Sequence, residues 1–315
     1  MQDKLIDLIL KINKKYFFKK SHPFNISKNG FLNLNYSDFE YEHTGELLDM
    51  YSKVVPVPID KILDLGTGTT FKVLEVWCGW WWKSVYIAEN PLTPLSGGIE
   101  VIWIDIDDNF LEQAKNFARQ KKVDKFVHFY KKSALNTGFE SGQFDVIIMS
   151  DVIEHIPETD KVFEEMYRIL KKDWIILFDF APYYHYFGHH LWDTIQIPWI
   201  HLFFTDKFLI RLYKKSVEWL VDWEARINLR IWKENNPNLV PVPNKGTGTK
   251  YKEVFDYLNK ISRKDFEKVM WRFVKKNKIS DLKINYYMLK KMNFLAKIPF
   301  VREIFIRHIV WYIKK

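Results

Sequence analysis

The sequence predicts an α/β fold built on a doubly wound sheet of seven strands, mostly parallel, with an antiparallel strand at the C-terminal edge. Three observations lead to this expectation. Short apolar runs alternate with amphipathic helical segments between residues 61 and 180, which is typical of a parallel sheet. The run FDVIIMS at 144–150 is apolar enough for a strand buried on both faces. The alternation of strands and helices then resumes after residue 252.

The expected elements follow from the spacing of apolar residues. We expect strands at 61–66, 99–107, 125–130, 144–150, 174–180, 279–289 and 306–315. We expect helices at 44–55, 109–122, 160–172 and 262–278. Ser262 is a typical N-cap for the last of these helices. At the N-terminus, Leu5, Leu8, Ile9 and Ile12 recur at helical spacing and predict a helix with these residues on its apolar face.

Changes in pattern divide the chain into four parts. Residues 1–58 form a helical N-terminal segment, and 59–180 contain the first five strands. Residues 181–252 interrupt the alternation and are rich in aromatic residues, proline and histidine, whereas 253–315 complete the sheet. Open α/β sheets bind ligands at the carboxyl ends of their strands, so we expect the insertion at 181–252 to act as a lid.

Composition limits the possible classes of protein. The 315 residues are 47% hydrophobic and 28% charged, which is ordinary for a globular protein. Cys78 is the single cysteine, which excludes an internal disulfide and a cysteine-rich metal site and fits a reducing compartment. The N-terminus lacks the features of a signal peptide, and no run of about 18 apolar residues occurs. A cytoplasmic protein without a transmembrane segment is therefore expected.

The net charge of +9 favours anionic partners, although scattered lysines also fit simple solvation. The stretch at 293–315 is basic and amphipathic, so peripheral contact with a membrane stays open beside the preferred interpretation as a strand. The oligomeric state is not predicted.

Two local patterns indicate a nucleoside site. ILDLGTGTT at 62–70 is an apolar run that enters a turn with Gly66 and Gly68, where the backbone can approach a ligand closely. The N-terminus of a following helix would offer unpaired N–H groups to an anionic group. A Gly-x-Gly turn is also common in ordinary strand–helix connections. Asp105 ends the next strand, where a carboxylate can accept hydrogen bonds from ribose hydroxyls.

A third pattern makes the combination more specific. QFDVIIMSDVIEHI at 143–156 is followed by a helix with the pattern E-x-x-R-x-L at 165–170. Together the three motifs resemble class I S-adenosylmethionine-dependent methyltransferases, particularly the small-molecule branch that includes the ubiquinone-type enzymes. The resemblance covers residues 60–180 and implies a Rossmann-like sheet and S-adenosyl-L-methionine as cofactor. It implies a small-molecule methyl acceptor, and the His, Tyr and Trp residues concentrated in 181–252 suit an acceptor that is aromatic or apolar. The cofactor-binding residues it implies are Asp64, Gly66, Thr67, Gly68, Asp105, Ile106, Ser133, Ala134, Ser150 and His155.

The sequence departs from the family pattern at four places. One is structural, since Lys172-Asp173-Trp174 replaces the Pro-Gly-Gly turn before the fifth strand. Gly66 and Asp105 lie 39 positions apart, about twice the separation expected from the resemblance, and we assign the excess to an extra loop or extended helix at 77–98. Thr70 stands where the family often has a third glycine. Ser133-Ala134 stands where an acidic residue followed by alanine usually meets the adenine.

The insertion contains candidates for acid–base chemistry. Methyl transfer from a sulfonium depends mainly on positioning, but an acceptor hydroxyl, amine or carbon acid can need a general base. His190 and Asp193 are three positions apart, so on a helix the carboxylate would share a face with the imidazole and orient it. His190, Asp193 and His201 are therefore the candidate catalytic residues, although a structural role in a lid fits them equally. No H-E-x-x-H pattern is present, and no bound metal is expected.

Other functions stay open at this stage. The positive charge suggests an RNA or protein methyltransferase. The Asn/Asp-Pro-Pro-aromatic motif of amino-methylating nucleic-acid enzymes is absent after the fourth strand, where the sequence reads Ser150-Asp151-Val152-Ile153. A nucleic-acid partner is therefore disfavoured but not excluded. A non-catalytic module that binds S-adenosylmethionine is a further alternative. A dehydrogenase is disfavoured because G-x-G-x-x-G spacing does not follow ILDLG.

Overall fold

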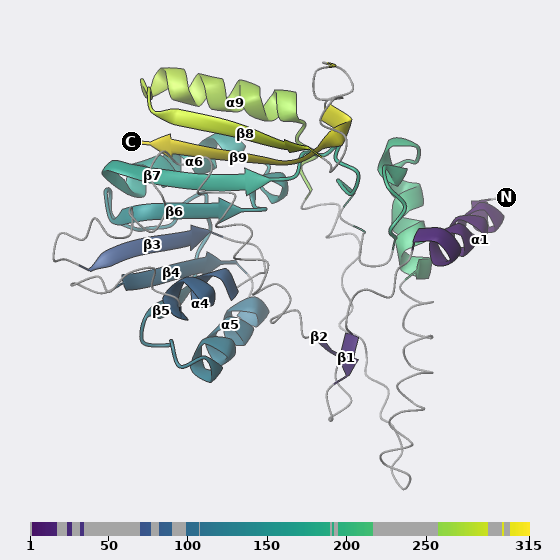
Figure 1. Cartoon of the computed structure of the whole chain (residues 1–315), viewed down its shortest axis with the longest axis horizontal. Helices are drawn as coiled ribbons and strands as arrows, with labels where there is room; N and C mark the ends of the chain where they lie inside the picture. Colours follow the sequence, from purple (N-terminus) through teal and green to yellow (C-terminus); the bar gives the residue numbers. More distant parts are fainter. Residues whose placement is uncertain are drawn as a thin grey trace, which may run out of the picture. The chain divides into compact units, whose positions relative to one another are not determined.

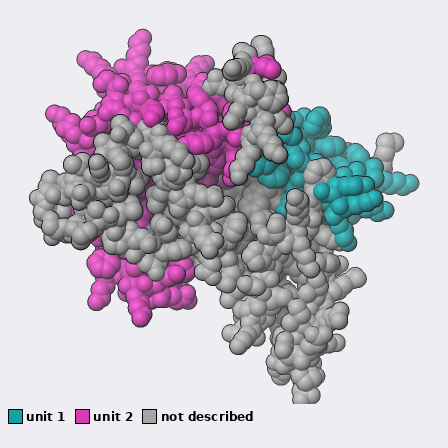
Figure 2. Space-filling model, viewed as in Figure 1, with its two compact units in different colours: residues 1–37, 183–258 teal, residues 38–182, 259–315 magenta. Residues whose placement is uncertain are grey.

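The computed structural model describes residues 2–17, 24–26, 32–34, 70–76, 82–89, 99–106, 108–189, 191, 195–216, 258–288, 298 and 303–315. The chain forms two compact units, coloured separately in Figure 2. Residues 1–37 and 183–258 form one, which we call the insertion unit, and residues 38–182 and 259–315 form the other, which we call the sheet unit.

The sheet unit contains a seven-stranded sheet with the order β5-β4-β3-β6-β7-β9-β8 (Figure 1). Its strands are β3 (Phe71–Val76), β4 (Ile99–Asp105), β5 (Val127–Lys131), β6 (Phe144–Ser150), β7 (Leu170–Phe180), β8 (Leu282–Met288) and β9 (Ile306–Lys314). Strands β3 to β7 pair in parallel, and β9 runs antiparallel to both β7 and β8. The predicted doubly wound, mostly parallel sheet is confirmed. The antiparallel C-terminal strand β9 is not the edge strand itself, because it lies between β7 and β8 and β8 forms the edge of the sheet.

The first strand of the sheet differs from the prediction. β3 occupies the position between β4 and β6, where Val73 pairs with both Val101 and Val146. The prediction that 61–66 fills this position is therefore wrong, and those residues lie outside the part of the chain that the structure describes. ILDLG and FKVLEV are both short apolar runs that end near a glycine. Local hydrophobicity does not distinguish the two runs. The pairing of 71–76 with β4 on one side and β6 on the other does.

Alternate residues of the strands pack against opposite faces of the sheet, as the period of a strand requires. One buried cluster joins Leu74, Ile147 and Phe178 to helices α6 (Thr159–Ile169) and α9 (Arg263–Lys276). The other cluster joins the intervening strand residues to α4 (Trp82–Glu89), while α5 (Asp108–Gln120) contributes to both. The predicted helices at 109–122, 160–172 and 262–278 are confirmed. Ser262 caps α9, since its hydroxyl accepts a hydrogen bond of 3.1 Å from the Asp265 N–H.

The E-x-x-R pattern of α6 has a structural role. Glu165 accepts hydrogen bonds from the Thr137 N–H and hydroxyl, at 2.8 and 2.6 Å. It also forms an ion pair of 2.8 Å with Arg168. The guanidinium of Arg168 also donates to the Phe139 carbonyl at 2.8 Å. The hydrogen bonds from Arg168 and Thr137 outweigh partial burial and lower the pKa of Glu165 to about 2. These contacts fix the loop that follows β5.

The insertion unit joins segments that are distant in sequence. Helix α1 (Gln2–Ile12) is paired with the helix at 206–216 by the ion pairs Asp3–Arg211 and Asp7–Lys215, at 2.9 and 2.8 Å. The prediction treated 1–58 and 181–252 as separate segments, whereas 1–37 and 183–258 form a single unit. The unit also contains a short antiparallel pair, β1 (Phe24–Ile26) and β2 (Leu32–Leu34).

The predicted N-terminal helix is confirmed, but its apolar face was misassigned. Ile6 and Ile9 are buried in the core of the insertion unit, whereas Leu5, Leu8 and Ile12 are exposed. Ile6 and Ile9 are three positions apart and therefore lie on the same face of the helix. Packing against apolar residues between 191 and 213 buries this face, and the face with Leu5, Leu8 and Ile12 stays exposed. The predicted helix at 44–55 lies outside the described residues, and the role of the insertion as a lid stays a prediction. Among the helices that the structure describes, none is long and apolar enough to cross a membrane.

Gly188 is expected to tolerate no side chain. A Cβ atom at this position would lie 1.8 Å from the carbonyl oxygen of Tyr183, and the Gly188 N–H already donates to the His185 carbonyl at 2.9 Å. The loop must therefore move to accept Gly188→Ala, which should lower the free energy of unfolding by about 1–3 kcal/mol. Denaturant unfolding curves measure this change. Gly138→Asn is the control. A Cβ atom at position 138 would have the flexible Lys132 Nζ as its nearest atom, at 3.5 Å, and asparagine tolerates the φ of 65° found at this position. Equal stability of Gly188→Ala and the wild type would contradict the expectation.

Candidate functional site

The parallel strands bring the predicted cofactor-binding residues to one edge of the sheet. Asp105 and Ser150 are the last residues of β4 and β6, and Ser133 follows the end of β5. Since β4, β5 and β6 point the same way, their carboxyl ends meet at the same edge (Figure 1). Ligands of open α/β sheets bind at this edge.

Asp105 and its neighbours combine a carboxylate with apolar surface. The side chain of Asp105 is buried, and its backbone carbonyl accepts a hydrogen bond of 2.9 Å from the Lys132 N–H. Ile106, the next residue, is 59% exposed. Ser133 is exposed and its hydroxyl accepts from the Leu135 N–H at 3.2 Å, while Ala134 packs partly against the core. A carboxylate beside exposed aliphatic and small side chains suits a ribose next to an adenine ring.

The loop after β6 is held in place by Asn259, which belongs to the sheet unit. It contains a turn of 3-10 helix, η2 (Ile153–His155), whose last residue His155 is half-buried. The side-chain amide of Asn259 donates to the carbonyls of Ile153 and Ile156 at 2.6 and 2.7 Å. The backbone N–H of Asn259 donates to the Glu154 carbonyl at 2.8 Å. These three hydrogen bonds fix the path of the chain beside Ser150.

A group of ionisable side chains lies at the ends of β6 and β7. His308 of β9 places its Nε2 atom 2.8 Å from the Asp179 carboxylate and 3.2 Å from the Asp151 carboxylate. The Asp179 side chain has no exposed area, while those of His308 and Asp151 are 21% and 37% exposed. Burial lowers the pKa of His308, but hydrogen bonds and charge interactions with both carboxylates outweigh it and raise this pKa to about 10. The imidazole is therefore protonated at neutral pH.

Glu154 adds a buried carboxyl beside this group. Only 2% of Glu154 is exposed, and burial followed by the charge of Asp151 raises its pKa well above the usual range. Its Oε2 atom has no hydrogen-bond partner among the described residues. Asp151, Glu154, Asp179 and His308 were missed as site residues. The available signal was a charged or titratable residue inside an apolar strand pattern, at Asp179 in WIILFDF and at His308 in IRHIVWYIKK.

With this geometry established, comparison with known proteins identifies the fold family. Residues 74–178 match the family model described as "Methyltransferase domain". This part of the chain is a methyltransferase domain. The match begins inside β3 and ends inside β7, so it includes Asp105, Ser133, Ala134, Ser150 and His155.

Several curated proteins are similar to the methyltransferase domain. Phosphoethanolamine N-methyltransferase 2 of Caenorhabditis elegans is 36% identical over 74 residues, which is 24% of this chain and 17% of that protein. Demethylmenaquinone methyltransferase of Lactobacillus johnsonii is 23% identical over 40% of this chain and 56% of its own length. The chain thus spans between about a sixth and just over half of these relatives.

Among solved structures, Haemonchus contortus phosphoethanolamine N-methyltransferase 2, in complex with phosphomonomethylethanolamine and S-adenosylhomocysteine, is similar to this chain. It is 17% identical with a TM-score of 0.44, over 78% of this chain and 49% of that one.

Six predicted site residues lie outside the described part of the chain, namely Asp64, Gly66, Thr67, Gly68, His190 and Asp193. Their roles stay predictions. His201 belongs to the insertion unit and not to the methyltransferase domain. It is buried, with its Nε2 atom 2.8 Å from the Tyr183 carbonyl oxygen and its ring 5.3 Å from that of His189. This environment is typical of a packed histidine, and a catalytic role for His201 also stays a prediction.

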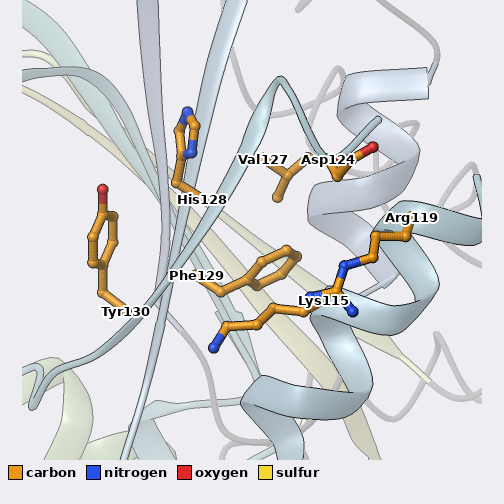
Figure 3. Close-up of a pocket in the computed structure, with 7 residues that line it drawn as sticks. All are labelled: Lys115, Arg119, Asp124, Val127, His128, Phe129 and Tyr130. Atoms are coloured by element: carbon orange, nitrogen blue, oxygen red, sulfur yellow. The ribbon is translucent and has the colours of Figure 1, made fainter. Parts of the chain in front are cut away.

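A pocket of about 330 Å³ lies on the methyltransferase domain between α5 and the edge strand β5 (Figure 3). Lys115 and Arg119 line it from the second half of α5, and His128 and Phe129 from β5. α5 begins just after the carboxyl end of β4 and packs back along the strands, so this half of the helix lies away from Asp105. The pocket is therefore distinct from the edge that carries the predicted cofactor residues.

The raised pKa of His308 predicts how stability depends on pH. A group whose pKa rises on folding stabilises the folded state fully below its unfolded pKa, which is 6.5 for histidine. This contribution should disappear as the pH rises from about 6.5 to about 10. The difference in unfolding free energy between wild type and His308→Gln should therefore be largest below pH 6.5 and shrink across that range. Denaturant titrations at several pH values measure it, and a difference that does not change with pH would contradict the assignment.

Proposed function

We propose that this protein is an S-adenosylmethionine-dependent methyltransferase that acts on a small molecule. The observation that carries the proposal is Asp105, a buried carboxylate at the end of β4 within the methyltransferase domain. The similarity to methyltransferases of small molecules supports the class of acceptor. We also propose a cytoplasmic location, which fits the single cysteine.

In the proposed complex each residue of the strand edge has a role. Asp105 accepts hydrogen bonds from the ribose hydroxyls, and Ile106 covers one side of the adenine. Ser133 and Ala134 border the adenine from the end of β5. Ser150 and His155 border the methionine part from the end of β6. S-adenosylmethionine supplies an activated methyl group, so the chain contributes mainly by holding the acceptor in line with it.

We propose that the glycine loop for this cofactor follows β3 instead of lying at 66–68. β3 fills the central position of the sheet, and the family match begins at residue 74, after Gly66 and Gly68. Ser84, in the first turn of α4, donates a hydrogen bond to Glu75 near the end of β3. A strand followed by a short connection and a helix is the arrangement that the cofactor loop requires. In sequence, the connection contains Gly79, which lies 26 positions before Asp105.

We keep the insertion as a proposed lid over the acceptor, with His190 as its base. His190→Ala should then lower the methylation rate by about 10²–10⁴-fold and leave cofactor affinity unchanged. Single-turnover kinetics with an acceptor found by screening measure this rate. An unchanged rate would mean that the reaction proceeds by positioning alone or with another base.

Native mass spectrometry and calorimetry test the proposed function directly. We expect S-adenosylmethionine and S-adenosylhomocysteine to bind with micromolar-range dissociation constants, while NAD does not bind. Formation of S-adenosylhomocysteine with a panel of small acceptors would distinguish an enzyme from a module that only binds the cofactor. Binding of NAD in place of both sulfur nucleosides, or of none of the three, would overturn the proposal.

A further inference from the structure

We propose that the outer face of α9 is a docking surface for an anionic membrane, that is, for a phospholipid bilayer with negatively charged headgroups. α9 lies in the outer layer of the sheet unit, next to β8 (Figure 1). The proposal goes beyond the enzyme class and does not depend on it. It rests on four residues, which we call the α9 stripe: Lys268, Trp271, Arg272 and Lys275.

The α9 stripe runs along one side of its helix. The spacing of its residues, i, i+3, i+4 and i+7, places them on a single face. All four side chains are exposed, and Trp271 is 50% exposed. The opposite face of α9 packs into the core of the sheet unit through Phe266, Met270 and Phe273. The stripe is therefore the side of the helix that faces solvent.

The positive charge of the α9 stripe is not neutralised by its own helix. Its three cations form no ion pair among the residues that the structure describes. The two acidic residues of α9 have other partners. Asp265 accepts a hydrogen bond of 2.6 Å from the Ser262 hydroxyl, and Glu267 pairs with Arg263. An anionic bilayer attracts lysine and arginine side chains near its surface, so the charge of the stripe complements such a bilayer.

Trp271 gives the α9 stripe an apolar group that suits the boundary between water and lipid. An indole ring has an apolar body and a polar N–H, and tryptophan is enriched at membrane interfaces for this reason. The ring packs against that of Trp311, which is fully buried, with the two centroids 6.0 Å apart. Trp271 is thus supported from the core while half of it is open to solvent. A side chain that is already ordered loses little freedom when it enters a bilayer.

The shape of this surface favours a lipid bilayer over a nucleic acid. A single helix presents a convex ridge, and a flat surface can contact every residue of one line along it. Proteins that bind single-stranded nucleic acids instead use a charged groove with several aromatic side chains on which bases stack. The α9 stripe has one aromatic ring. The pocket described above lies between α5 and β5, and α9 does not line it.

Residues 293–315, the other segment considered for membrane contact, are less suited to it. This segment contains β9, which lies between β7 and β8 in the sheet. The side chains from 309 to 313 are buried there, so they do not reach a bilayer in the folded protein. α9 therefore offers the better surface for membrane contact.

Cosedimentation with vesicles tests the docking surface. The wild type should bind vesicles of phosphatidylcholine that contain about one third phosphatidylglycerol, and it should not bind vesicles of phosphatidylcholine alone. Added salt should weaken binding, because it screens the attraction between charges. A variant with Lys268→Gln, Arg272→Gln and Lys275→Gln together, the stripe variant, should bind anionic vesicles at least about tenfold more weakly. Trp271→Ala keeps the charge and should bind about threefold more weakly or worse.

The matched control removes the same charge from the other edge of the sheet. Lys122, Lys125 and Lys131 are exposed lysines in β5 and the turn before it. Their joint replacement by glutamine should leave binding to anionic vesicles within about twofold of the wild type. Circular dichroism confirms that each variant is folded. Equal binding by the stripe variant and the wild type, an equal loss in the control, or no preference for anionic vesicles would overturn the proposal.

A labelled single-stranded RNA oligonucleotide tests the competing occupant on the same samples. RNA binding that is lost in the stripe variant, together with no binding to anionic vesicles, would identify a nucleic-acid surface and overturn the membrane proposal. Unchanged vesicle binding by Trp271→Ala would also contradict it, because the ring would then not enter the bilayer. The expected result is vesicle binding that needs both the cations and Trp271, whether or not the protein binds S-adenosylhomocysteine.

Discussion

Asp105→Ala is expected to weaken the binding of S-adenosylmethionine by roughly 30- to 150-fold, equivalent to about 2–3 kcal/mol. The carboxylate lies at the end of β4, where two ribose hydroxyls would each donate a charge-assisted hydrogen bond. Alanine removes both acceptors and leaves the hydroxyls without partners. Calorimetry with S-adenosylmethionine and with S-adenosylhomocysteine measures the loss, which should be similar for the two because the ribose is common to both.

Two further variants make the Asp105 result interpretable. Because Asp105 is buried, alanine can also disturb packing, and circular dichroism must show that the variant is folded. Asp105→Asn keeps the volume and one acceptor, so its affinity should fall between those of alanine and wild type. Asp108→Ala is the matched control, since this exposed residue lies three positions on and pairs with Lys131 at the surface. If folded Asp105→Ala binds as tightly as the wild type, the nucleoside site lies elsewhere.

The helices and strands were predictable wherever the residue pattern of a single segment was enough to define the element. FDVIIMS is apolar enough for the centre of a sheet, and 144–150 is a fully buried strand. Ser262 precedes a segment with strong helical periodicity, and it caps α9 as expected. The prediction of the first strand was wrong because 61–66 and 71–76 are both short apolar runs that end near a glycine. The choice between them depends on pairing with β4 and β6, which no single segment encodes.

The candidate site shows the same limit. Asp105 was predictable because a carboxylate at the end of an apolar strand is a local pattern. The contact between Asp179 and His308 joins residues 129 positions apart, and it exists only because the C-terminal strand pairs with β7. The insertion unit likewise depends on α1 packing against a helix about 200 positions later in the chain. Features that depend on distant pairing had to come from the structure.

Gly79→Val is expected to weaken cofactor binding by about 100-fold or more, whereas Gly66→Val and Gly68→Val should change it less than about threefold. The reason is the position of β3, which holds the central place in the sheet and brings its carboxyl end beside Asp105 of β4. The backbone of a cofactor loop must approach its ligand closely, and a branched side chain at the point of approach would clash. The family match from residue 74 includes Gly79 and excludes the other two glycines.

The three valine variants form a matched series, since each makes the same substitution in a Gly-containing segment after an apolar run. Calorimetry with S-adenosylhomocysteine, after circular dichroism has shown that each variant is folded, gives the three affinities. Loss of binding in Gly66→Val and Gly68→Val with an unaffected Gly79→Val would restore the loop predicted at 66–68. It would also mean that the cofactor is not held at the end of β3. The expected order, with Gly79→Val alone defective, would explain the 39 positions between Gly66 and Asp105 without an extra loop. The true cofactor loop would then simply begin later in the chain, after Val76.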